Sequence, residues 1–277
     1  MTRSTAGSKR IESAFATARD NGRIAFVPYV VAGFPESNAS EAIALAALDA
    51  GADLIEIGLP YSDPLADGVT LQRASAAALA SGQTLDGSFD LVEQVARQRP
   101  DKPVLVMGYV NQFMGPRGSH AVAQRLAAAG ASGAIVADLT PDEGETLEEE
   151  FEKAGLALVY LVAPTSPPDR VEMIASRSGG FLYCVSLTGV TGARSRGPGN
   201  ATNLVARMKK ASTLPVGVGF GVSRPEHVSA VARAGADGVI VGSALIDALG
   251  PDGKDIDRFA DLCADLAGAT VRAASAA

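Results

Sequence analysis

A single glutamate interrupts an otherwise apolar run that has the pattern of a buried strand. The run is Asp53-Leu54-Ile55-Glu56-Ile57-Gly58, and alternation along a strand places Glu56 on the face opposite to the two isoleucines. Isoleucines suit a face covered by helices, so Glu56 is expected to point to the interior. Burial disfavours the ionised form and raises the pKa of such a carboxyl, which suits a group that gives and takes a proton. A structural glutamate bound to backbone groups or tyrosine hydroxyls fits the same pattern.

Two aspartates follow Glu56 closely, in Pro60-Tyr61-Ser62-Asp63-Pro64-Leu65-Ala66-Asp67-Gly68. Asp63 precedes a proline, which is typical of an aspartate that caps a turn. Asp67 is less well explained by turn chemistry. We expect one of the two carboxylates to approach Glu56.

Two glycine-rich turns come after apolar runs near the end of the chain. They are Gly217-Val218-Gly219-Phe220-Gly221-Val222-Ser223 and Val241-Gly242-Ser243-Ala244. Glycine lets backbone N–H groups come close to an anion, and the start of a helix adds partial positive charge. The two turns together predict a phosphate site, although either one alone could be a tight turn.

Other reaction types are disfavoured by the positions of lysine, histidine and cysteine. No lysine falls inside an expected strand, as a Schiff-base aldolase of the barrel type would require. The only histidines, His120 and His227, lie in helical stretches without metal-ligand spacing, so no metal site is expected. Cys184 and Cys263 are expected to be buried thiols in a reducing compartment.

Eight short apolar runs are expected to be the strands that position these groups. Most are continuous rather than alternating, as in parallel strands covered on both faces. They are residues 24–31, 54–58, 104–108, 134–138, 156–162, 181–187, 216–219 and 238–242.

Helical segments separate the expected strands, and the joints between them repeat. Segments 39–50, 124–129 and 224–234 have helical spacing, and a helix over 9–20 precedes the first strand. Gly51, Gly130, Gly155 and Gly235 each end a helix just before a strand, where glycine is free to adopt positive φ. Eight such units in about 250 residues are typical of the (β/α)8 TIM barrel. An open doubly wound sheet is the alternative, but no G-x-G-x-x-G follows the first strand.

The composition of the 277 residues is that of a globular protein, with 47% apolar and 20% charged residues. The net charge is −7, from 24 basic and 31 acidic residues, and the absence of a basic run disfavours an extended nucleic-acid surface. No secretory signal and no apolar run of membrane-spanning length is found, so a cytoplasmic protein is expected. We expect one α/β domain over 1–277, with flexible ends at 1–7 and about 271–277, and a short extra helix after the eighth strand.

The segment 54–68 closely resembles the signature of the tryptophan synthase α subunit family. The resemblance continues at Phe26-Val27-Pro28-Tyr29, at 186–192, at Gly219-Phe220-Gly221-Val222-Ser223 and at Gly242-Ser243-Ala244. It covers nearly the full chain in the family's order. It implies a lyase that cleaves indole-3-glycerol phosphate to indole and glyceraldehyde 3-phosphate by a retro-aldol reaction.

The resemblance also implies roles for individual residues. Glu56 matches the general acid–base group, Asp67 the carboxylate that binds the indole N–H, Thr191 the lid residue that closes onto Asp67, and Tyr183 the tyrosine beside the catalytic glutamate. The phosphate cradle matches Gly192, Gly221, Gly242 and Ser243, and the indole pocket matches Phe26, Tyr109 and Phe220. Residues 188–200, rich in Gly, Ser and Arg, are the expected lid.

A β subunit that carries pyridoxal phosphate is the partner that the resemblance implies, in an α2β2 complex, with no cofactor on this chain. Two departures bear on this. Leu187-Thr188 replaces the usual Arg-Ala, and residues 112–118, in the region that contacts the β subunit in the family, are atypical. A free-standing lyase, a non-catalytic phosphate-binding barrel and a sugar-phosphate isomerase are the alternatives. Intact Glu56 and Asp67 argue against the second, and the histidine positions argue against a metal-dependent epimerase.

Overall fold

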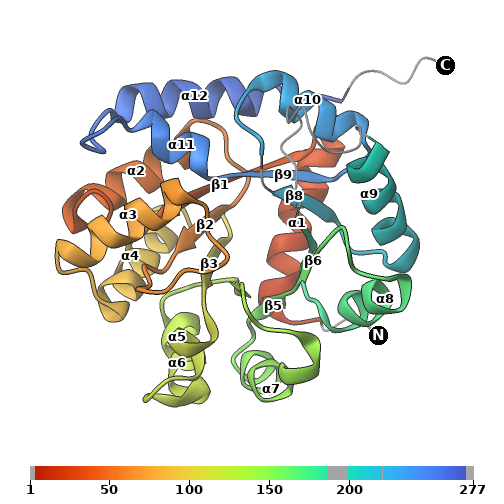
Figure 1. Ribbon diagram of the computed structural model, residues 1–277, viewed down its shortest axis with the longest axis horizontal. Coiled ribbons are helices and arrows are strands. Elements are labelled where there is room, and N and C mark those ends of the chain that lie inside the picture. The colour runs from red at the N-terminus through yellow and green to blue at the C-terminus, as the bar shows by residue number, and fades with distance from the viewer. Residues whose placement is uncertain (1–3, 186–198, 220, 273–277) are drawn as a thin grey trace.

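A computed structural model describes residues 4–185, 199–219 and 221–272, and its strands form a nearly closed parallel barrel (Figure 1). The strands pair in the order β5-β4-β3-β2-β1-β9-β8-β7-β6. Their bounds are β1 Ala25–Val31, β2 Ile55–Gly58, β3 Val104–Gly108, β4 Gly133–Val136, β5 Ala157–Val159, β6 Leu161–Val162, β7 Leu182–Val185, β8 Val216–Gly219 and β9 Gly238–Val241. The predicted TIM barrel is confirmed.

The described chain has nine strands where the sequence predicts eight, because the run 156–162 is divided at Tyr160. Before the break, β5 pairs with β4, and after it β6 pairs with β7. Tyr160 is buried between them, and its N–H donates to the Ser178 hydroxyl at 3.3 Å. The chain changes its hydrogen-bonding partner here, so one apolar run supplies both ends of the sheet.

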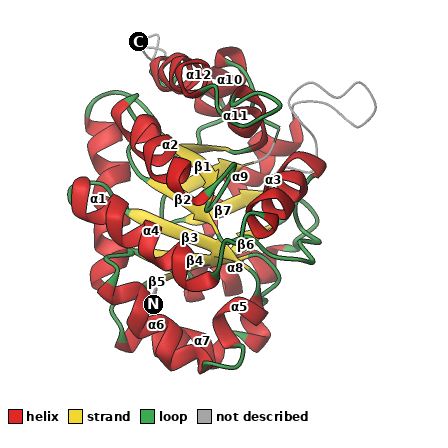
Figure 2. Ribbon diagram, turned by 90° about the vertical axis from the view of Figure 1, so that its left-hand side faces the viewer, coloured by secondary structure: helices red, strands yellow, loops and turns green. Residues whose placement is uncertain are grey.

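Helices surround the barrel, as the two perpendicular views show (Figures 1 and 2). Their bounds are α1 Ala6–Asp20, α2 Ser37–Asp49, α3 Val69–Ala80, α4 Leu85–Gln98, α5 Val110–Met114, α6 Gly118–Ala128, α7 Glu145–Lys153, α8 Pro168–Arg177, α9 Gly199–Ala211, α10 Pro225–Arg233, α11 Ser243–Ala248 and α12 Ile256–Gly268, with a 3-10 turn at Pro141–Glu143. The predicted extra helix after the last strand is α11. None of the helices described is both long enough and apolar enough to be a membrane span.

The first helix packs on the amino-terminal ends of the strands. Phe15 of α1 stacks on Phe181, just before β7, with ring centroids 5.3 Å apart. The N–H of Gly7 donates to the carbonyl of Gly155, just before β5, at 2.8 Å. The helix predicted over 9–20 is therefore present and covers the amino-terminal mouth, and the opposite mouth is left for the site.

The repeated glycine joints have the predicted backbone conformation. Gly51, Gly130, Gly155 and Gly235 all have positive φ, between 75° and 107°. In two of these joints an aspartate stands two residues after the glycine. Its carboxylate accepts a hydrogen bond from a backbone N–H at the start of a neighbouring strand. Asp53 accepts from the Phe26 N–H and Asp237 from the Val216 N–H, both at 2.9 Å. The joint therefore ends a helix and also aligns two adjacent strands.

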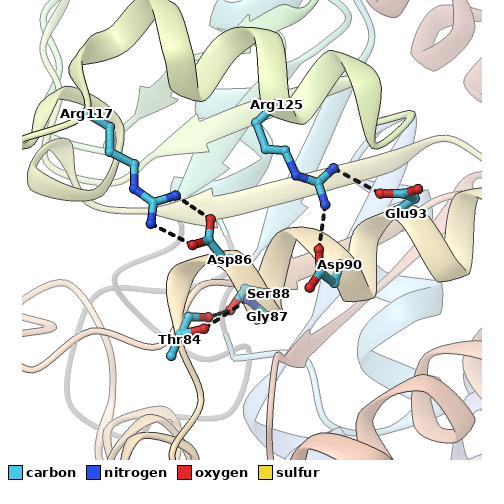
Figure 3. A network of polar contacts seen from close by, with 8 residues as sticks. All are labelled: Thr84, Asp86, Gly87, Ser88, Asp90, Glu93, Arg117 and Arg125. Carbon is cyan, nitrogen blue, oxygen red and sulfur yellow. Dashed lines mark hydrogen bonds and ion pairs between the residues drawn. The ribbon is translucent and has the colours of Figure 1, made fainter.

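Arginines on α6 and just before it join that helix to α4 on the outside of the barrel (Figure 3). Arg117 pairs with Asp86, and Arg125 pairs with Asp90 at 2.5 Å and with Glu93 at 3.0 Å. These side chains are largely exposed, so each pair contributes little to the free energy of folding.

Both cysteines are buried free thiols, as predicted. Burial raises the pKa of each to about 12. His120 lies in α6 and His227 in α10, also as predicted.

Candidate active site

A cavity of about 240 Å³ opens at the carboxyl ends of the strands, which is where the active sites of barrel enzymes lie. Side chains from β1, β2, β3, β7 and β9 form its floor, and the segments after β2, β8 and β9 form its walls. The described lining residues are Tyr29, Glu56, Asp67, Leu71, Met107, Tyr183, Gly221, Val222, Ser223, Ile240, Gly242, Ser243, Ala244 and Asp247. Six of the residues predicted from the sequence are therefore brought together.

Glu56 lies at the floor of the cavity with no exposed surface. In the described part of the chain, neither of its carboxylate oxygens has a hydrogen-bond partner. Burial, and after it the charge of Asp67, raise the pKa of Glu56 to about 8. The predicted inward orientation is confirmed, and the carboxyl is protonated at neutral pH.

Asp67 lines the same cavity from the loop between β2 and α3. Burial raises its pKa to about 6, while hydrogen bonding to the Tyr109 hydroxyl lowers it. At neutral pH this carboxyl is mostly ionised, so the two acids of the cavity differ in charge. Asp63 is exposed and accepts a hydrogen bond from the Ser62 hydroxyl at 2.7 Å, in agreement with a turn residue.

Tyr29 and Tyr183 flank Glu56, and glycines on the neighbouring strands make room for them. A Cβ atom on Gly58 would collide with the Tyr29 hydroxyl, and one on Gly219 would lie 2.5 Å from the Tyr183 hydroxyl. Burial raises the pKa of both tyrosines well above the usual value. Both therefore stay neutral and can donate a hydrogen bond in the cavity.

Gly221, Gly242 and Ser243 form the end of the cavity formed by the segments after β8 and β9. Gly221 has a φ of +75°, which residues with a side chain rarely adopt. Gly242 precedes α11, whose first N–H groups have no acceptor inside the helix. This end of the cavity has the backbone character that the predicted phosphate cradle requires.

Two residues of the predicted indole pocket, Phe26 and Tyr109, are not among the described lining residues of the cavity. Phe26 is completely buried in β1 and is not among the described lining residues. Side chains alternate between the two faces of a strand, so Tyr29, three residues after Phe26 in β1, points to the opposite face and lines the cavity. Tyr109 lies outside the wall, and its hydroxyl accepts the Ala66 N–H at 3.0 Å. Contact of Phe26 and Tyr109 with indole remains a prediction.

Three predicted residues, Thr191, Gly192 and Phe220, lie outside the described residues, as does most of the expected lid 188–200. The sequence reasoning missed Leu71, Met107, Ile240 and Asp247 as lining residues. Met107 and Ile240 could have been found from the alternation of side chains along their strands. Asp247 could have been found only because it stands four residues after Ser243 in a helix.

Comparisons with known proteins agree with this arrangement. The model of the family "Tryptophan synthase alpha chain" matches residues 15–271. The tryptophan synthase alpha chain of Gloeobacter violaceus is 45% identical over 268 residues, which cover 95% of each chain. That of Chloroflexus aurantiacus is 46% identical over 240 residues, covering 87% of this chain and 90% of the relative. The chain belongs to the tryptophan synthase alpha chain family.

Solved structures of tryptophan synthase share the fold of this alpha chain. A chain from the Mycobacterium tuberculosis enzyme superposes with a TM-score of 0.87 at 39% identity, covering 95% of this chain and 99% of that one. The alpha subunit from Legionella pneumophila str. Paris gives 0.86 at 32% identity, with 94% and 98% coverage.

Family membership establishes the role in tryptophan biosynthesis. Alpha chains of this family are lyases that cleave indole-3-glycerol phosphate, and they work with a beta subunit. They need no cofactor of their own, because pyridoxal phosphate belongs to the beta subunit.

Proposed function

We propose that Glu56 and Asp67 carry out the retro-aldol cleavage of indole-3-glycerol phosphate in the cavity described above. The observation that supports this most strongly is the difference between their pKa values, about 8 for Glu56 and about 6 for Asp67. Two carboxyls in one cavity with separated pKa values are suited to opposite roles, one as an acid and one as an anion.

Glu56, protonated before the reaction, gives its proton to C3 of the indole ring. The ring then carries a positive charge shared with its nitrogen. The Glu56 carboxylate next takes the proton of the glycerol hydroxyl beside the scissile bond. The O–H electrons form the aldehyde C=O, the C–C bond breaks, and its electrons return to the ring. Indole and glyceraldehyde 3-phosphate are released, and Glu56 is again protonated.

Asp67 stays ionised and accepts a hydrogen bond from the indole N–H. As the ring becomes positively charged, this interaction strengthens, and an interaction that is stronger in the transition state lowers the barrier. The neutral hydroxyls of Tyr29 and Tyr183, which line the same cavity, can donate to the glycerol hydroxyls. Leu71, Met107 and Ile240 provide the apolar surface for the indole ring, with Phe220 predicted to add to it.

The phosphate of the substrate is held by backbone N–H groups at Gly221, Gly242 and Ser243, and Gly192 is predicted to add another. Such groups bind an anion without the desolvation of a charged side chain. With the phosphate at this end, the indole ring extends toward Asp67 and its C3 atom toward Glu56. This orientation is supported by the positions of the three groups around a single cavity.

Indole release by a Glu56→Gln variant tests the proposed chemistry. Glutamine keeps the shape of the side chain but cannot transfer the proton, so turnover should fall by roughly 10²–10⁴-fold. Turnover near that of the wild type would exclude Glu56 as the acid–base group. A wild-type chain that binds glycerol phosphate but releases no indole, even with the beta subunit, would favour the non-catalytic barrel.

The complex is proposed to be α2β2. The support on this chain is a pair of exposed apolar residues, Leu65 in the loop between β2 and α3 and Val69 at the start of α3, with 94% and 83% of their surface exposed. Large apolar side chains so exposed are typical of protein interfaces. Sedimentation of the mixed subunits gives the stoichiometry, and indole release that is unchanged by the beta subunit would favour a free-standing lyase.

The buried thiols Cys184 and Cys263 are compatible with the cytoplasm, where we propose that the enzyme works.

A further inference from the structure

A third carboxylate, that of Asp247, lines the cavity at its proposed phosphate end. Asp247 lies in α11, four residues after Ser243, and residues four apart project from the same face of a helix. Its carboxylate is therefore close to the position proposed for the substrate's phosphate.

Asp247 is held by two side chains of α3, the helix that packs beside α11 (Figure 1). The Thr70 hydroxyl lies 3.3 Å from each of its carboxylate oxygens. The Arg73 guanidinium donates from Nη2 to Oδ1 at 3.2 Å. Both Arg73 and Asp247 keep more than half of their side-chain surface exposed, 55% and 56%, so the guanidinium remains accessible to solvent.

The charges of the cavity walls make this pair significant. The described lining residues include three carboxyl groups, those of Glu56, Asp67 and Asp247, and no lysine or arginine. A phosphate dianion bound at this end of the cavity would be repelled by an uncompensated Asp247. In the part of the chain that the structure describes, Arg73 is the cationic residue paired with a lining carboxylate.

We infer that Arg73 is a substrate-binding residue that supplies the positive charge for the phosphate, and that Asp247, assisted by Thr70, holds its guanidinium at that end of the cavity. A guanidinium has five N–H donors, and the described bond to Asp247 uses one of them, so others are free to bind phosphate oxygens. The inference rests on the proposed position of the phosphate and adds a side chain to the backbone cradle.

Calorimetric titration with glycerol 3-phosphate tests the inference, because two substitutions should act in opposite directions. Arg73→Gln leaves Asp247 uncompensated, so affinity should fall by roughly tenfold at low salt. Asp247→Asn removes the repelling charge, while the amide oxygen can still accept from Arg73 and keep its guanidinium in place, so affinity should rise by a few-fold. Both effects should shrink as the ionic strength increases.

A purely structural tie between α3 and α11 gives a different result. Breaking the tie from either side would then weaken glycerol 3-phosphate binding and also alter the affinity for uncharged indole, and this outcome would overturn the inference. Arg125→Gln, which removes two ion pairs between the outer helices α4 and α6 (Figure 3), is the matched control and should leave affinity unchanged.

The experiment also separates the inference from the proposed function. If the wild-type chain binds glycerol 3-phosphate and Arg73→Gln binds it equally well, Arg73 has no part in phosphate binding while the backbone cradle stands. If the wild-type chain does not bind glycerol 3-phosphate, the cradle and the inference are both wrong.

Discussion

The hydroxyl of Tyr109 accepts a hydrogen bond from the N–H of Ala66 at 3.0 Å, one residue before Asp67. The same hydroxyl lowers the pKa of Asp67 by hydrogen bonding. The Tyr109 ring stacks on Tyr61 with centroids 5.1 Å apart. The backbone N–H of Tyr109 donates to the side-chain oxygen of Gln112 at 3.0 Å. The residue at the start of α5 thus fixes both the position and the ionisation of a carboxylate in the loop after β2.

Tyr109→Phe should raise the pKa of Asp67 above about 6. The substitution removes the hydroxyl that stabilises the ionised carboxylate and leaves the stacked ring in place. Because Asp67 acts as an anion, the acid limb of the pH–rate profile should move to higher pH, by up to about one unit. Tyr61→Phe, which loses only a contact from Asn111 at 2.8 Å, is the control, and an acid limb that moves equally in both variants would contradict the role of Tyr109.

The wild-type enzyme should show a bell-shaped dependence of kcat/KM on pH. Activity requires ionised Asp67 and protonated Glu56, so it should fall below a pKa of about 6 and above a pKa of about 8. These values belong to the interacting pair. The profile is measured by indole release at substrate concentrations well below KM. Activity that keeps rising well above pH 8 would show that Glu56 does not act as the acid.

Glu56→Gln should stabilise the fold, and increasingly so as pH rises. The pKa of Glu56 is about 8 in the folded chain, above the unfolded value of about 4.3. From about pH 4 to 8 the unfolded state loses a proton that the folded state keeps, so this carboxyl destabilises the fold progressively and by a constant amount above about pH 8. The full effect is on the order of 5 kcal/mol.

Urea unfolding at about pH 5 and about pH 9 measures the difference in the free energy of unfolding between Glu56→Gln and the wild type. Glu172→Gln, on an exposed position of α8, is the control. A stability difference that is the same at both pH values would mean that Glu56 is not protonated in the folded chain.

Gly221→Ala and Gly242→Asp should both weaken the binding of glycerol phosphate, by roughly tenfold or more. The first puts a Cβ where φ is +75° and displaces the backbone N–H, and the second adds a repelling carboxylate. Gly82→Ala is a matched control for backbone strain, because Gly82 has a φ of +89° with open space around its Cβ position. Of the three variants, only Gly82→Ala should keep normal glycerol phosphate affinity in calorimetry. Normal affinity in Gly221→Ala and Gly242→Asp would contradict the proposed phosphate cradle.

Leu65→Asp should weaken association with the beta subunit by roughly tenfold or more, because it puts a charge into an apolar contact. Val271→Asp is the control, at an exposed apolar position 62% accessible near the amino-terminal end of β1. Sedimentation of each variant with the beta subunit makes the comparison. If both variants assemble as well as the wild type, Leu65 is not part of the interface.

The barrel could be predicted from the sequence because each unit repeats its own local signals. Most residues of the strand runs are apolar, and the glycine joints have the positive φ that their position requires. The break at Tyr160 could not be predicted, because the change of pairing partner from β4 to β7 leaves the run equally apolar on both sides.

The acid at the floor of the cavity could be predicted because a carboxyl inside an apolar strand contradicts its local pattern. Glu56 is such a residue, and it is completely buried. Tyr29 could have been found from strand parity alone. The pair Arg73–Asp247 could not, because its members lie 174 residues apart and each is an ordinary charged residue of a surface helix.

The distribution of tyrosines gives this chain an optical property of its own. It contains five tyrosines and no tryptophan, so its near-ultraviolet emission comes from tyrosine alone. Tyr29 and Tyr183 line the cavity, and Tyr109 stacks on Tyr61 in the loop between β2 and α3. Indole absorbs at the wavelengths where tyrosine emits, so an indole ring in the cavity would accept excitation energy from four of the five fluorophores. The protein therefore carries a built-in spectroscopic reporter, and occupancy of its site can be followed without any label.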